Sequence, residues 1–495
     1  MTIYFSGHSF KYEVEGVCKL FFPLVRFSHI FEPGQLADGD FIFTRRKKGK
    51  SNTILWIRVS LGGKTRRSHI QIPNTAGRYD NECERLLCIL LYRLLSEWLK
   101  IYPQWGILTG VRPVNIIQKE RGAGKTDEDI RQFFREKYLV SPEKLELAFQ
   151  TADNQLPILK SLCPDSYSLY IAIPFCKSRC SYCSFVSHAI TTKKATDKVD
   201  EYVELLCREL AATAKLADEL GLTLDTIYIG GGTPTALSPE QLFKVTRAVC
   251  ANFDVKNARE YTIEAGRADT ISPEKLQIIA EAGAGRISVN PQTFNDAVLR
   301  EIGRRHTSGE VLEAYREARR TGFSAVNMDF IAGLLGDTLE SFRNTIDRAI
   351  ALVPENITVH TLTVKRSAAL FWNEEARKGL RTDLTAAMTE YAEKALIEAG
   401  YRPYYLYRQK NTVGNLENVG YALPGTESCY NVYIMEENQT ILACGAGGVT
   451  KIVGKGENPI HRVFNFKYHF EYIDRFDEII ERKKQVKEYY AGSKQ

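Results

Sequence analysis

The pattern of apolar and polar residues changes near residue 168 and divides the chain into two kinds of sequence. Before that point, short runs of alternating apolar and polar residues are separated by turn signals such as Gly62-Gly63. This pattern predicts a small antiparallel sheet over residues 1–75. The predicted strands are Tyr12–Glu15, Phe41–Thr44, Ile54–Val59 and His69–Ile72.

Leucines at helical spacing follow this sheet. They lie on one apolar face of a helix predicted from Cys83 to Ile101, and two further helices are predicted over residues 127–138 and 142–154. A connector then leads to about Asp165. Residues 1–160 are therefore predicted to form an N-terminal α+β domain, whose role the sequence does not indicate.

From Ser168 onward, strand-like and helix-like segments alternate, which predicts an α/β fold. Six such units predict a parallel sheet with helices outside, curled into a partial (β/α)6 barrel over residues 161–370. Residues 371–495 are predicted to form a small C-terminal α+β domain. The predicted barrel strands are Leu169–Phe175, Thr226–Gly230, Tyr261–Glu264, Arg286–Asn290, Val326–Ile331 and Ile357–Leu362.

The composition of the 495 residues, 44% apolar and 25% charged, is ordinary for a soluble globular protein. No apolar run approaches the roughly 20 residues that cross a bilayer, so neither a membrane partner nor a membrane location is expected. The net charge of +6 permits an anionic small substrate but does not indicate nucleic acid. The basic runs Arg45–Lys48 and Lys64–Arg67 are interpreted as solvated hairpin tips or, alternatively, as a patch for RNA or a protein partner.

The run Gly122–Thr126 superficially resembles a phosphate-binding loop. That motif needs a glycine five positions before Gly124, where Lys119 stands, and it needs a preceding strand. The sequence therefore predicts no nucleotide phosphate site here.

Three cysteines, Cys176, Cys180 and Cys183, follow the first predicted barrel strand with the spacing C-x3-C-x2-C. Thiolates on a short loop suit an iron–sulfur cluster, and three of them leave one iron open to a chelating ligand. There are two alternatives. The cysteines could bind zinc together with His188 in a Cys3His site, or they could be three unconnected cysteines of the protein core. Disulfides are not expected, because nothing at the N-terminus looks secretory and the other cysteines are scattered, as in a reducing cytoplasm.

Polar residues and glycines also gather where the predicted strands end, which is where parallel α/β folds bind ligands. Gly230–Thr235 follows the second strand, and its glycines allow a close approach of backbone to a ligand. Gln292 can both donate and accept hydrogen bonds, and Arg304 can form a forked contact with a carboxylate. Each of these residues, like Glu264 and Asp329, is more often structural when it occurs alone, but the series indicates one ligand site.

With these motifs, residues 168 to about 450 resemble the oxygen-independent coproporphyrinogen III oxidase (dehydrogenase) family of the radical S-adenosylmethionine superfamily. Segments 106–113, 263–269, 290–293 and 403–410 resemble its HemZ-type branch. The resemblance implies a 4Fe–4S cluster held by Cys176, Cys180 and Cys183. It also implies that S-adenosylmethionine is surrounded by Tyr170, Gly231, Gly232, Thr233, Glu264, Gln292, Arg304 and Asp329.

The reaction implied by this resemblance is oxidative decarboxylation of coproporphyrinogen III propionates to vinyl groups, which gives protoporphyrinogen IX. A 5′-deoxyadenosyl radical removes a hydrogen atom from a propionate β-carbon, and loss of CO2 and one electron follows. An electron donor such as flavodoxin or ferredoxin is implied as a partner. Candidate anchors for the substrate carboxylates, each also interpretable as an ordinary surface or core-pairing residue, are Arg267, Lys365, Arg366, Arg408 and Lys410.

Four departures from the family pattern concern the substrate rather than the cluster. Family members often have histidine at Ala172 and at Tyr430, cysteine at Phe185, and proline after Gly333-Leu334. Phe185 bears on whether a second S-adenosylmethionine binds. Two alternative functions therefore stay open: a haem-binding chaperone, and another radical reaction on a tetrapyrrole, such as methyl transfer or ring opening.

Overall fold

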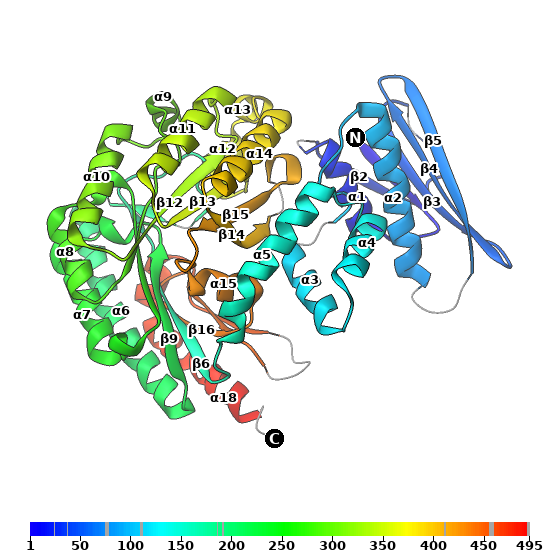
Figure 1. Ribbon diagram of the computed structural model, residues 1–495. Coiled ribbons are helices and arrows are strands. Elements are labelled where there is room, and N and C mark those ends of the chain that lie inside the picture. Colours follow the sequence, from blue (N-terminus) through cyan, green and yellow to red (C-terminus); the bar gives the residue numbers. More distant parts are fainter. Residues whose placement is uncertain are drawn as a thin grey trace. The chain divides into compact units, whose positions relative to one another are not determined.

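The computed structural model describes the chain except residues 24, 37, 75–78, 109–111, 186, 191–192, 410–411, 455–459 and 493–495, and it describes only the backbone of residues 193–197. The chain forms two compact units (Figure 1). Unit 1 comprises Met1–Phe149 and Arg408–Glu417, and unit 2 comprises Gln150–Tyr407 and Asn418–Gln495. The three domains inferred from the sequence, 1–160, 161–370 and 371–495, stay a prediction.

Unit 1 contains a five-stranded sheet in the order β2-β1-β3-β4-β5. Strand β1 runs parallel to β2 and β3, whereas the β3–β4 and β4–β5 pairs are antiparallel. The predicted sheet is therefore confirmed over its last three strands, but the prediction that it is antiparallel throughout is wrong. The strands are β1 (Thr2–Ser6), β2 (Ser28–Phe31), β3 (Phe41–Lys48), β4 (Asn52–Leu61) and β5 (Lys64–Pro73).

The strand predicted at Tyr12–Glu15 is also wrong, because these residues belong to helix α1 (Lys11–Phe21). Four residues fit both a strand and a helix, and the helical period appears only when Val14, Val17 and Cys18 are read together as its buried positions.

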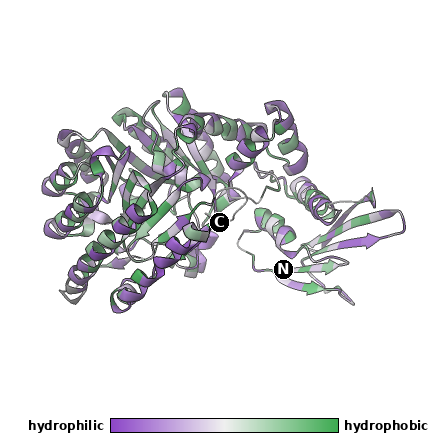
Figure 2. Ribbon diagram, turned by 90° about the horizontal axis from the view of Figure 1, so that it is seen from below, coloured by the Kyte–Doolittle hydropathy of each residue, from purple (hydrophilic) through white to green (hydrophobic). Residues whose placement is uncertain are grey.

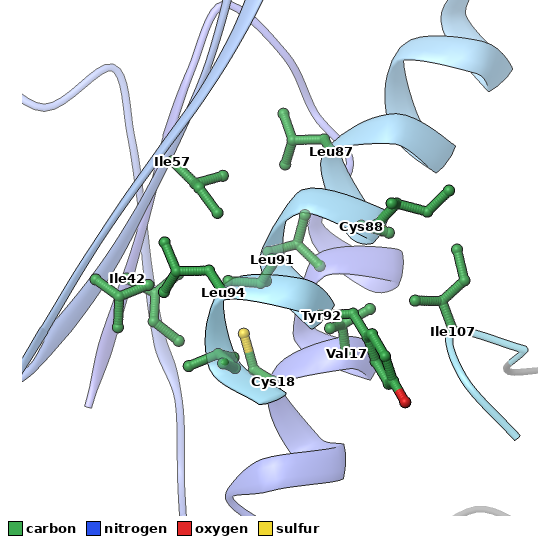
Figure 3. Packing of buried hydrophobic residues seen from close by; sticks show 14 of the residues in the cluster. Val17, Cys18, Ile42, Ile57, Leu87, Cys88, Leu91, Tyr92, Leu94 and Ile107 are labelled. Atoms are coloured by element: carbon green, nitrogen blue, oxygen red, sulfur yellow. The ribbon is translucent and has the colours of Figure 1, made fainter. Parts of the chain in front are cut away.

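Helix α2 (Tyr79–Leu99) confirms the predicted leucine-rich helix. Figure 3 shows its leucines, among them Leu91 and Leu94, beside Ile42 and Ile57 of the sheet. The other helices of this region are α3 (Pro113–Gly122), which was not predicted, and α4 (Asp127–Tyr138) and α5 (Pro142–Lys160), which were.

The run Gly122–Thr126 connects two helices and follows no strand. Thr126 caps α4: its hydroxyl accepts from the Asp129 amide at 3.2 Å, and the Asp129 carboxylate accepts from the Thr126 amide. The expectation that no strand precedes this run is confirmed.

The segment Arg408–Glu417, which connects β14 (Arg402–Arg408) to β15 (Glu417–Ala422), belongs to unit 1. Glu417 forms an ion pair of 2.6 Å with Lys144 and accepts a hydrogen bond of 2.7 Å from the Trp105 indole. All three side chains are buried. The Arg408 guanidinium, also buried, donates to the carbonyl of Leu108 and stacks over the Trp105 ring.

Unit 2 is built on an eleven-stranded sheet in the order β14-β15-β13-β12-β11-β10-β9-β6-β16-β17-β18. In this sheet the strands β6, β9, β10, β11, β12 and β13 pair in parallel and follow chain order, which confirms the predicted partial barrel. All six predicted strands are present. They are β6 (Ser166–Ile173), β9 (Thr223–Gly231), β10 (Glu260–Gly266), β11 (Arg286–Val289), β12 (Ala325–Ala332) and β13 (Asn356–Thr361).

Helices lie outside these strands in Figure 1, and Figure 2 shows them banded in hydrophilic and hydrophobic residues, as expected for helices with one face in solvent. Ser238 and Ser272 cap the N-termini of α7 and α8. No helix within the described residues is long and apolar enough to cross a membrane. The outer helices are α6 (Lys193–Leu220), α7 (Pro239–Asn252), α8 (Pro273–Glu281), α9 (Asp296–Glu301), α10 (Ser308–Thr321) and α11 (Leu339–Leu352).

The C-terminal part of the chain extends the barrel sheet at both edges. Strand β15 (Glu417–Ala422) pairs with β13 in the antiparallel sense, and β16 (Thr440–Cys444) pairs with β6 in the parallel sense. The remaining strands are β14 (Arg402–Arg408), β17 (Val449–Ile452) and β18 (His461–Phe464). The remaining helices are α12 (Ala369–Trp372), α13 (Glu374–Lys378), α14 (Thr382–Glu398), α15 (Cys429–Glu436), α16 (His469–Asp474), α17 (Phe476–Arg482) and α18 (Lys484–Gly492).

A buried carboxylate ties the last helices to the barrel. Glu209 of α6 has no exposed surface and pairs with Lys483 at 3.0 Å. It also accepts hydrogen bonds of 2.7 Å from the Tyr472 hydroxyl and from the Gly445 amide. These donors compensate for much of the cost of burying the charge.

Candidate functional site

The three cysteines lie on a loop that leaves β6 at Pro174. The loop begins with the short strand β7 (Phe175–Cys176), which pairs with β8 (His188–Ala189). Cys176 and Cys180 are buried and Cys183 is partly exposed. Burial, together with the neighbouring thiols Cys180 and Cys176, raises the pKa of the Cys183 thiol to about 11. The three sulfur atoms are therefore electrostatic neighbours.

These thiols fit a cluster better than a single ion. Among the described residues, no three His, Cys, Asp or Glu side chains gather closely enough to hold one metal ion. The structure thus forms no Cys3His zinc site: the His188 ring packs on the His469 ring, with 4.2 Å between centroids. Ligands of a 4Fe–4S cubane bind separate irons and stand farther apart than ligands of one ion, so three thiols on one loop fit that group.

The glycine run after β9 is joined to the cysteine loop by backbone hydrogen bonds. The Gly232 amide donates to the Ile173 carbonyl and the Thr233 amide to the Phe175 carbonyl, both at 2.8 Å. A Cβ atom on Gly232 would stand 2.5 Å from the Phe175 oxygen. The Thr233 hydroxyl lies 3.4 Å from the Cys176 sulfur. The glycine run therefore allows the end of β9 to pack closely against the backbone of the cysteine loop.

Glu264, at the end of β10, is bonded to a residue that the sequence analysis missed. The Tyr228 hydroxyl on β9 donates a 2.6 Å hydrogen bond to it. Burial raises the pKa of the Glu264 carboxyl to about 7, while the Tyr228 hydroxyl lowers it and the Asp329 charge raises it. This carboxyl can therefore exchange a proton near neutral pH.

Three tyrosine rings stack at this end of the barrel. Tyr228 lies 4.4 Å from Tyr430 and 6.3 Å from Tyr170, measured between ring centroids, with interplanar angles of 19° and 26°. Tyr170 and Tyr228 are paired in register across β6 and β9. This pairing is the signal that could have identified Tyr228, because cross-strand partners point to the same face.

Gln292 has φ of +70°, a left-handed conformation that is uncommon for residues other than glycine. Its backbone bridges to β12: its amide donates to the Asp329 carbonyl at 2.9 Å, and its carbonyl accepts from the Ile331 amide at 3.0 Å. Strained backbone held in this way is typical of functional sites.

Arg304 is buried near the cysteine loop. It donates to the Asn290 carbonyl at 2.7 Å and to the Tyr182 hydroxyl at 3.4 Å. The neighbouring Tyr182 and Cys180 raise the pKa of the guanidinium, although burial opposes this, so Arg304 stays charged. Its Nε is buried without a partner in the described part of the chain.

Asp329 accepts a 2.8 Å hydrogen bond from the Asn327 amide, and its other oxygen lies 3.9 Å from the His360 imidazole. Burial raises the pKa of Asp329, but His360 and Asn327 outweigh it and the pKa is lowered. Asp329 is therefore ionised at neutral pH. His360, on β13, is a second residue that the sequence analysis did not identify.

One inward row of the sheet is polar across three strands, because Glu264, Ser288 and Asn327 are paired in register. Within the described residues, several buried polar atoms at this end of the barrel have no hydrogen-bond partner, as expected where a polar ligand binds. They are Ser288 Oγ, Asn290 Oδ1, Arg304 Nε and the Tyr430 hydroxyl. This set of donors and acceptors fits the amine, carboxylate and hydroxyl groups of S-adenosylmethionine.

The basic residues considered as anchors for substrate carboxylates lie in different environments. Arg267 is a buried residue in an ion pair: it lies 3.0 Å from Asp269 and donates to the Ser178 carbonyl at 3.1 Å. Arg408 is buried in unit 1, Arg366 is exposed, and Lys410 lies outside the described residues. Lys365 is half-buried, and burial lowers its pKa while Cys183 raises it. Lys365 is thus an anchor candidate beside the cysteines. Arg267 also lies there, 3.7 Å from the Cys180 sulfur, but it is paired with Asp269.

The residues that depart from the family pattern occupy three environments. Ala172 is buried, and its carbonyl accepts a 2.9 Å hydrogen bond from Tyr202. Tyr430 is buried within the tyrosine stack. Phe185 is 65% exposed.

The partial barrel, the three-cysteine loop and the polar strand ends define the class of radical S-adenosylmethionine proteins. The model of the radical SAM superfamily matches residues 170–349. Members of this class use a 4Fe–4S cluster and S-adenosylmethionine.

The chain belongs, within this class, to the family of HemZ-type oxygen-independent coproporphyrinogen-III oxidase-like proteins. It is 39% identical to the protein of that name, HemZ, from Bacillus subtilis (strain 168), over 79% of this chain and 78% of the relative. It is also 31% identical to the haem chaperone HemW of Lactococcus lactis, over 65% of this chain and 79% of that protein. The fold is similar to that of coproporphyrinogen III oxidase (HemN) from Escherichia coli, with a TM-score of 0.50, 23% identity, and coverage of 66% of this chain and 72% of that one.

Proposed function

We propose that this protein decarboxylates the propionates of coproporphyrinogen III oxidatively to vinyl groups and so produces protoporphyrinogen IX, in a reducing cytoplasm. The observation that carries the proposal is the cysteine loop, which supplies three thiols next to strand ends with unpaired polar atoms. The relationship to HemZ supports the tetrapyrrole substrate.

In this proposal Cys176, Cys180 and Cys183 hold the cluster. The residues that surround S-adenosylmethionine are Tyr170, Gly231, Gly232, Thr233, Glu264, Gln292, Arg304 and Asp329. When bound, the cluster and S-adenosylmethionine supply a one-electron cleavage of the sulfonium that yields a 5′-deoxyadenosyl radical. The electron comes from a donor such as flavodoxin or ferredoxin.

The chain contributes charge, orientation and exclusion of water. Arg304 stays cationic beside the cysteine loop and is suited to a carboxylate. Glu264, oriented by Tyr228, is suited to accept from hydroxyl or amine groups. Lys365 is placed to pair with a substrate carboxylate, because it is a half-buried cation beside Cys183. Each reacting propionate loses a hydrogen atom, CO2 and one further electron.

The test is anaerobic turnover of reconstituted protein with S-adenosylmethionine, dithionite and coproporphyrinogen III, with products resolved by mass. Vinyl products together with 5′-deoxyadenosine support the proposal. Retention of haem without turnover would instead identify a chaperone related to HemW, and methylated or linear pigments would identify another radical reaction.

Cysteine variants supply the matched control for the cluster. Cys180→Ala is expected to lose the bound iron and the cleavage of S-adenosylmethionine. Cys163→Ala removes an exposed thiol outside the loop and is expected to retain about four irons per chain. Lys365→Ala is expected to raise KM for the substrate while iron content stays normal.

A further inference from the structure

Basic and aromatic side chains surround the exposed side of the cysteine loop. Three segments meet there, residues 177–185, 300–306 and 365–373. The Ser181 amide donates to the Ile302 carbonyl at 3.0 Å, and the Leu370 amide donates to the Ser181 carbonyl at 2.9 Å. The Ser367 hydroxyl donates to the Ser184 carbonyl at 3.0 Å. We name their exposed side chains the cysteine-loop face: Lys177, Arg179, Phe185, Arg300, Arg305, Arg366 and Trp372.

The charge of these segments is strongly one-sided. They contain seven lysines and arginines, and Glu301 is their single acidic residue. Arg304 is buried and Lys365 is half-buried, so the five remaining cations are exposed. Within the described residues, no salt bridge involves Arg300, Arg305 or Arg366, whereas Lys177 lies 3.7 Å from Asp269. The face therefore presents uncompensated positive charge.

Two large aromatic side chains lie within this basic surface. Phe185 is 65% exposed and Trp372 is 71% exposed. The Trp372 indole donates a 3.0 Å hydrogen bond to the backbone carbonyl of Arg366, which fixes the indole against that segment. Exposed aromatic residues framed by arginines are the composition of protein-docking sites, where a few such anchors carry most of the binding energy.

The position of this face matters for the chemistry. Cys183, one of the proposed cluster ligands, is partly exposed, lies two residues before Phe185 and interacts electrostatically with Lys365. A protein that delivers electrons must bring its own redox centre close to the cluster, and complementary charge speeds such an encounter.

We infer that the cysteine-loop face docks a small acidic electron-transfer protein that carries a flavin or an iron–sulfur centre. This inference rests on the proposed function, because it requires the cluster on the three cysteines. In the docked complex one electron passes to the cluster: the partner's centre is oxidised by one electron and the cluster is reduced by one. No bond forms or breaks in that transfer.

The first test measures binding directly. Reconstituted full-length protein is titrated with flavodoxin and, separately, with ferredoxin at low and at physiological ionic strength. The double charge reversal Arg300→Glu/Arg305→Glu is expected to weaken binding of a carrier about tenfold and to reduce its salt dependence. Iron content and circular dichroism should match those of the unchanged protein.

The control places the same charge change on the other basic surface. Strands β3 to β5, residues 41–73, contain nine lysines and arginines and no acidic residue. Lys64→Glu/Arg67→Glu reverses two exposed charges there. It is expected to leave carrier binding within a factor of two, because only the surface beside the cysteines matters. An equal loss in this control would assign the attraction to net charge or to the sheet and would overturn the inference.

The second test separates the docking face from the proposed chemistry. With dithionite as reductant, the Arg300→Glu/Arg305→Glu protein is expected to release 5′-deoxyadenosine at the rate of the unchanged protein. With reduced flavodoxin or ferredoxin it is expected to be about tenfold slower. Equal slowing with both kinds of reductant, or no binding of either carrier to the unchanged protein, would overturn the inference. Absence of 5′-deoxyadenosine with dithionite in the unchanged protein would instead refute the proposed function.

Discussion

The Tyr228 hydroxyl donates a hydrogen bond of 2.6 Å to Oε1 of Glu264 across two neighbouring barrel strands. Gly230 makes room for this pair, because a Cβ atom there would stand 2.8 Å from the Tyr228 ring and 2.9 Å from the Glu264 carboxyl carbon. The glycine run therefore does two things: it packs against the cysteine loop, and it clears space for a carboxyl whose pKa lies at about 7.

Tyr228→Phe is expected to change the pH dependence of S-adenosylmethionine binding. The phenol lowers the pKa of Glu264, so its loss should raise that pKa by roughly one unit. If the carboxylate contacts the ligand, affinity falls as pH drops through about 7, and the variant should show the same fall at higher pH. Calorimetric titration over a pH series measures this shift, and identical profiles for the two proteins would contradict the prediction.

Glu264→Gln is expected to stabilise the protein at alkaline pH while it weakens ligand binding. The folded protein holds the Glu264 proton up to about pH 7, whereas the unfolded chain releases it near 4.5. The free energy of unfolding therefore falls as pH rises between these values, and the full penalty, about 3 kcal/mol, remains above them. Urea unfolding at pH 5 and pH 8 should show a gain for the variant only at pH 8. A similar gain at both values would point to packing instead.

Gly232→Ala is expected to loosen the junction between β9 and the cysteine loop. The added Cβ would meet the carbonyl oxygens of Phe175 at 2.5 Å and of Ile173 at 2.9 Å, so backbone must move. We expect a loss of about 1–3 kcal/mol in unfolding free energy and poorer retention of iron. Gly122→Ala is the matched control, since nothing lies within 4 Å of its Cβ position. Chemical denaturation and iron analysis of both variants test this.

The barrel could be predicted from sequence because each strand is a short apolar run closed by turn or cap residues. The same logic drew attention to Glu264, Gln292 and Asp329, since charged and amide side chains within or directly after apolar strands are unusual. The sequence analysis did not identify Tyr228 and His360, because an aromatic or imidazole ring within a strand is common and forms no distinctive pattern. Only the cross-strand register, which pairs Tyr228 with Tyr170, places it at the site.

Other features depend on contacts between distant parts of the chain. The Arg408–Glu417 segment joins unit 1 through Lys144 and Trp105, which lie far away in sequence, so no local pattern indicates it. The capped helix α4 was predictable to the residue, because its capping box is local. Part of helix α1 was misassigned as a strand, because a window of four residues does not distinguish the repeat of a strand from the repeat of a helix.

Lys483→Met is expected to destabilise the protein by about 3–5 kcal/mol, because it leaves the Glu209 carboxylate buried without its cation. The remaining donors, Tyr472 and Gly445, hold the charge in place but do not neutralise it. Adding Glu209→Gln to this variant removes the unpaired charge and should recover most of the loss. Urea unfolding of the two single variants and the double variant measures the coupling, and additive effects would contradict it.

Tyr430→Phe separates the two functions that the relatives suggest. The Tyr430 hydroxyl is buried, has no hydrogen-bond partner within the described residues, and belongs to a ring stacked 4.4 Å from Tyr228. Removing an unsatisfied buried hydroxyl should keep or raise stability, by up to about 1 kcal/mol. If this residue stood in for a histidine that binds haem iron, the variant would lose haem and its phenolate absorption. Because the hydroxyl lies inside the stack, we expect any haem affinity to be unchanged. A lower affinity for haem in the variant would instead favour the chaperone function.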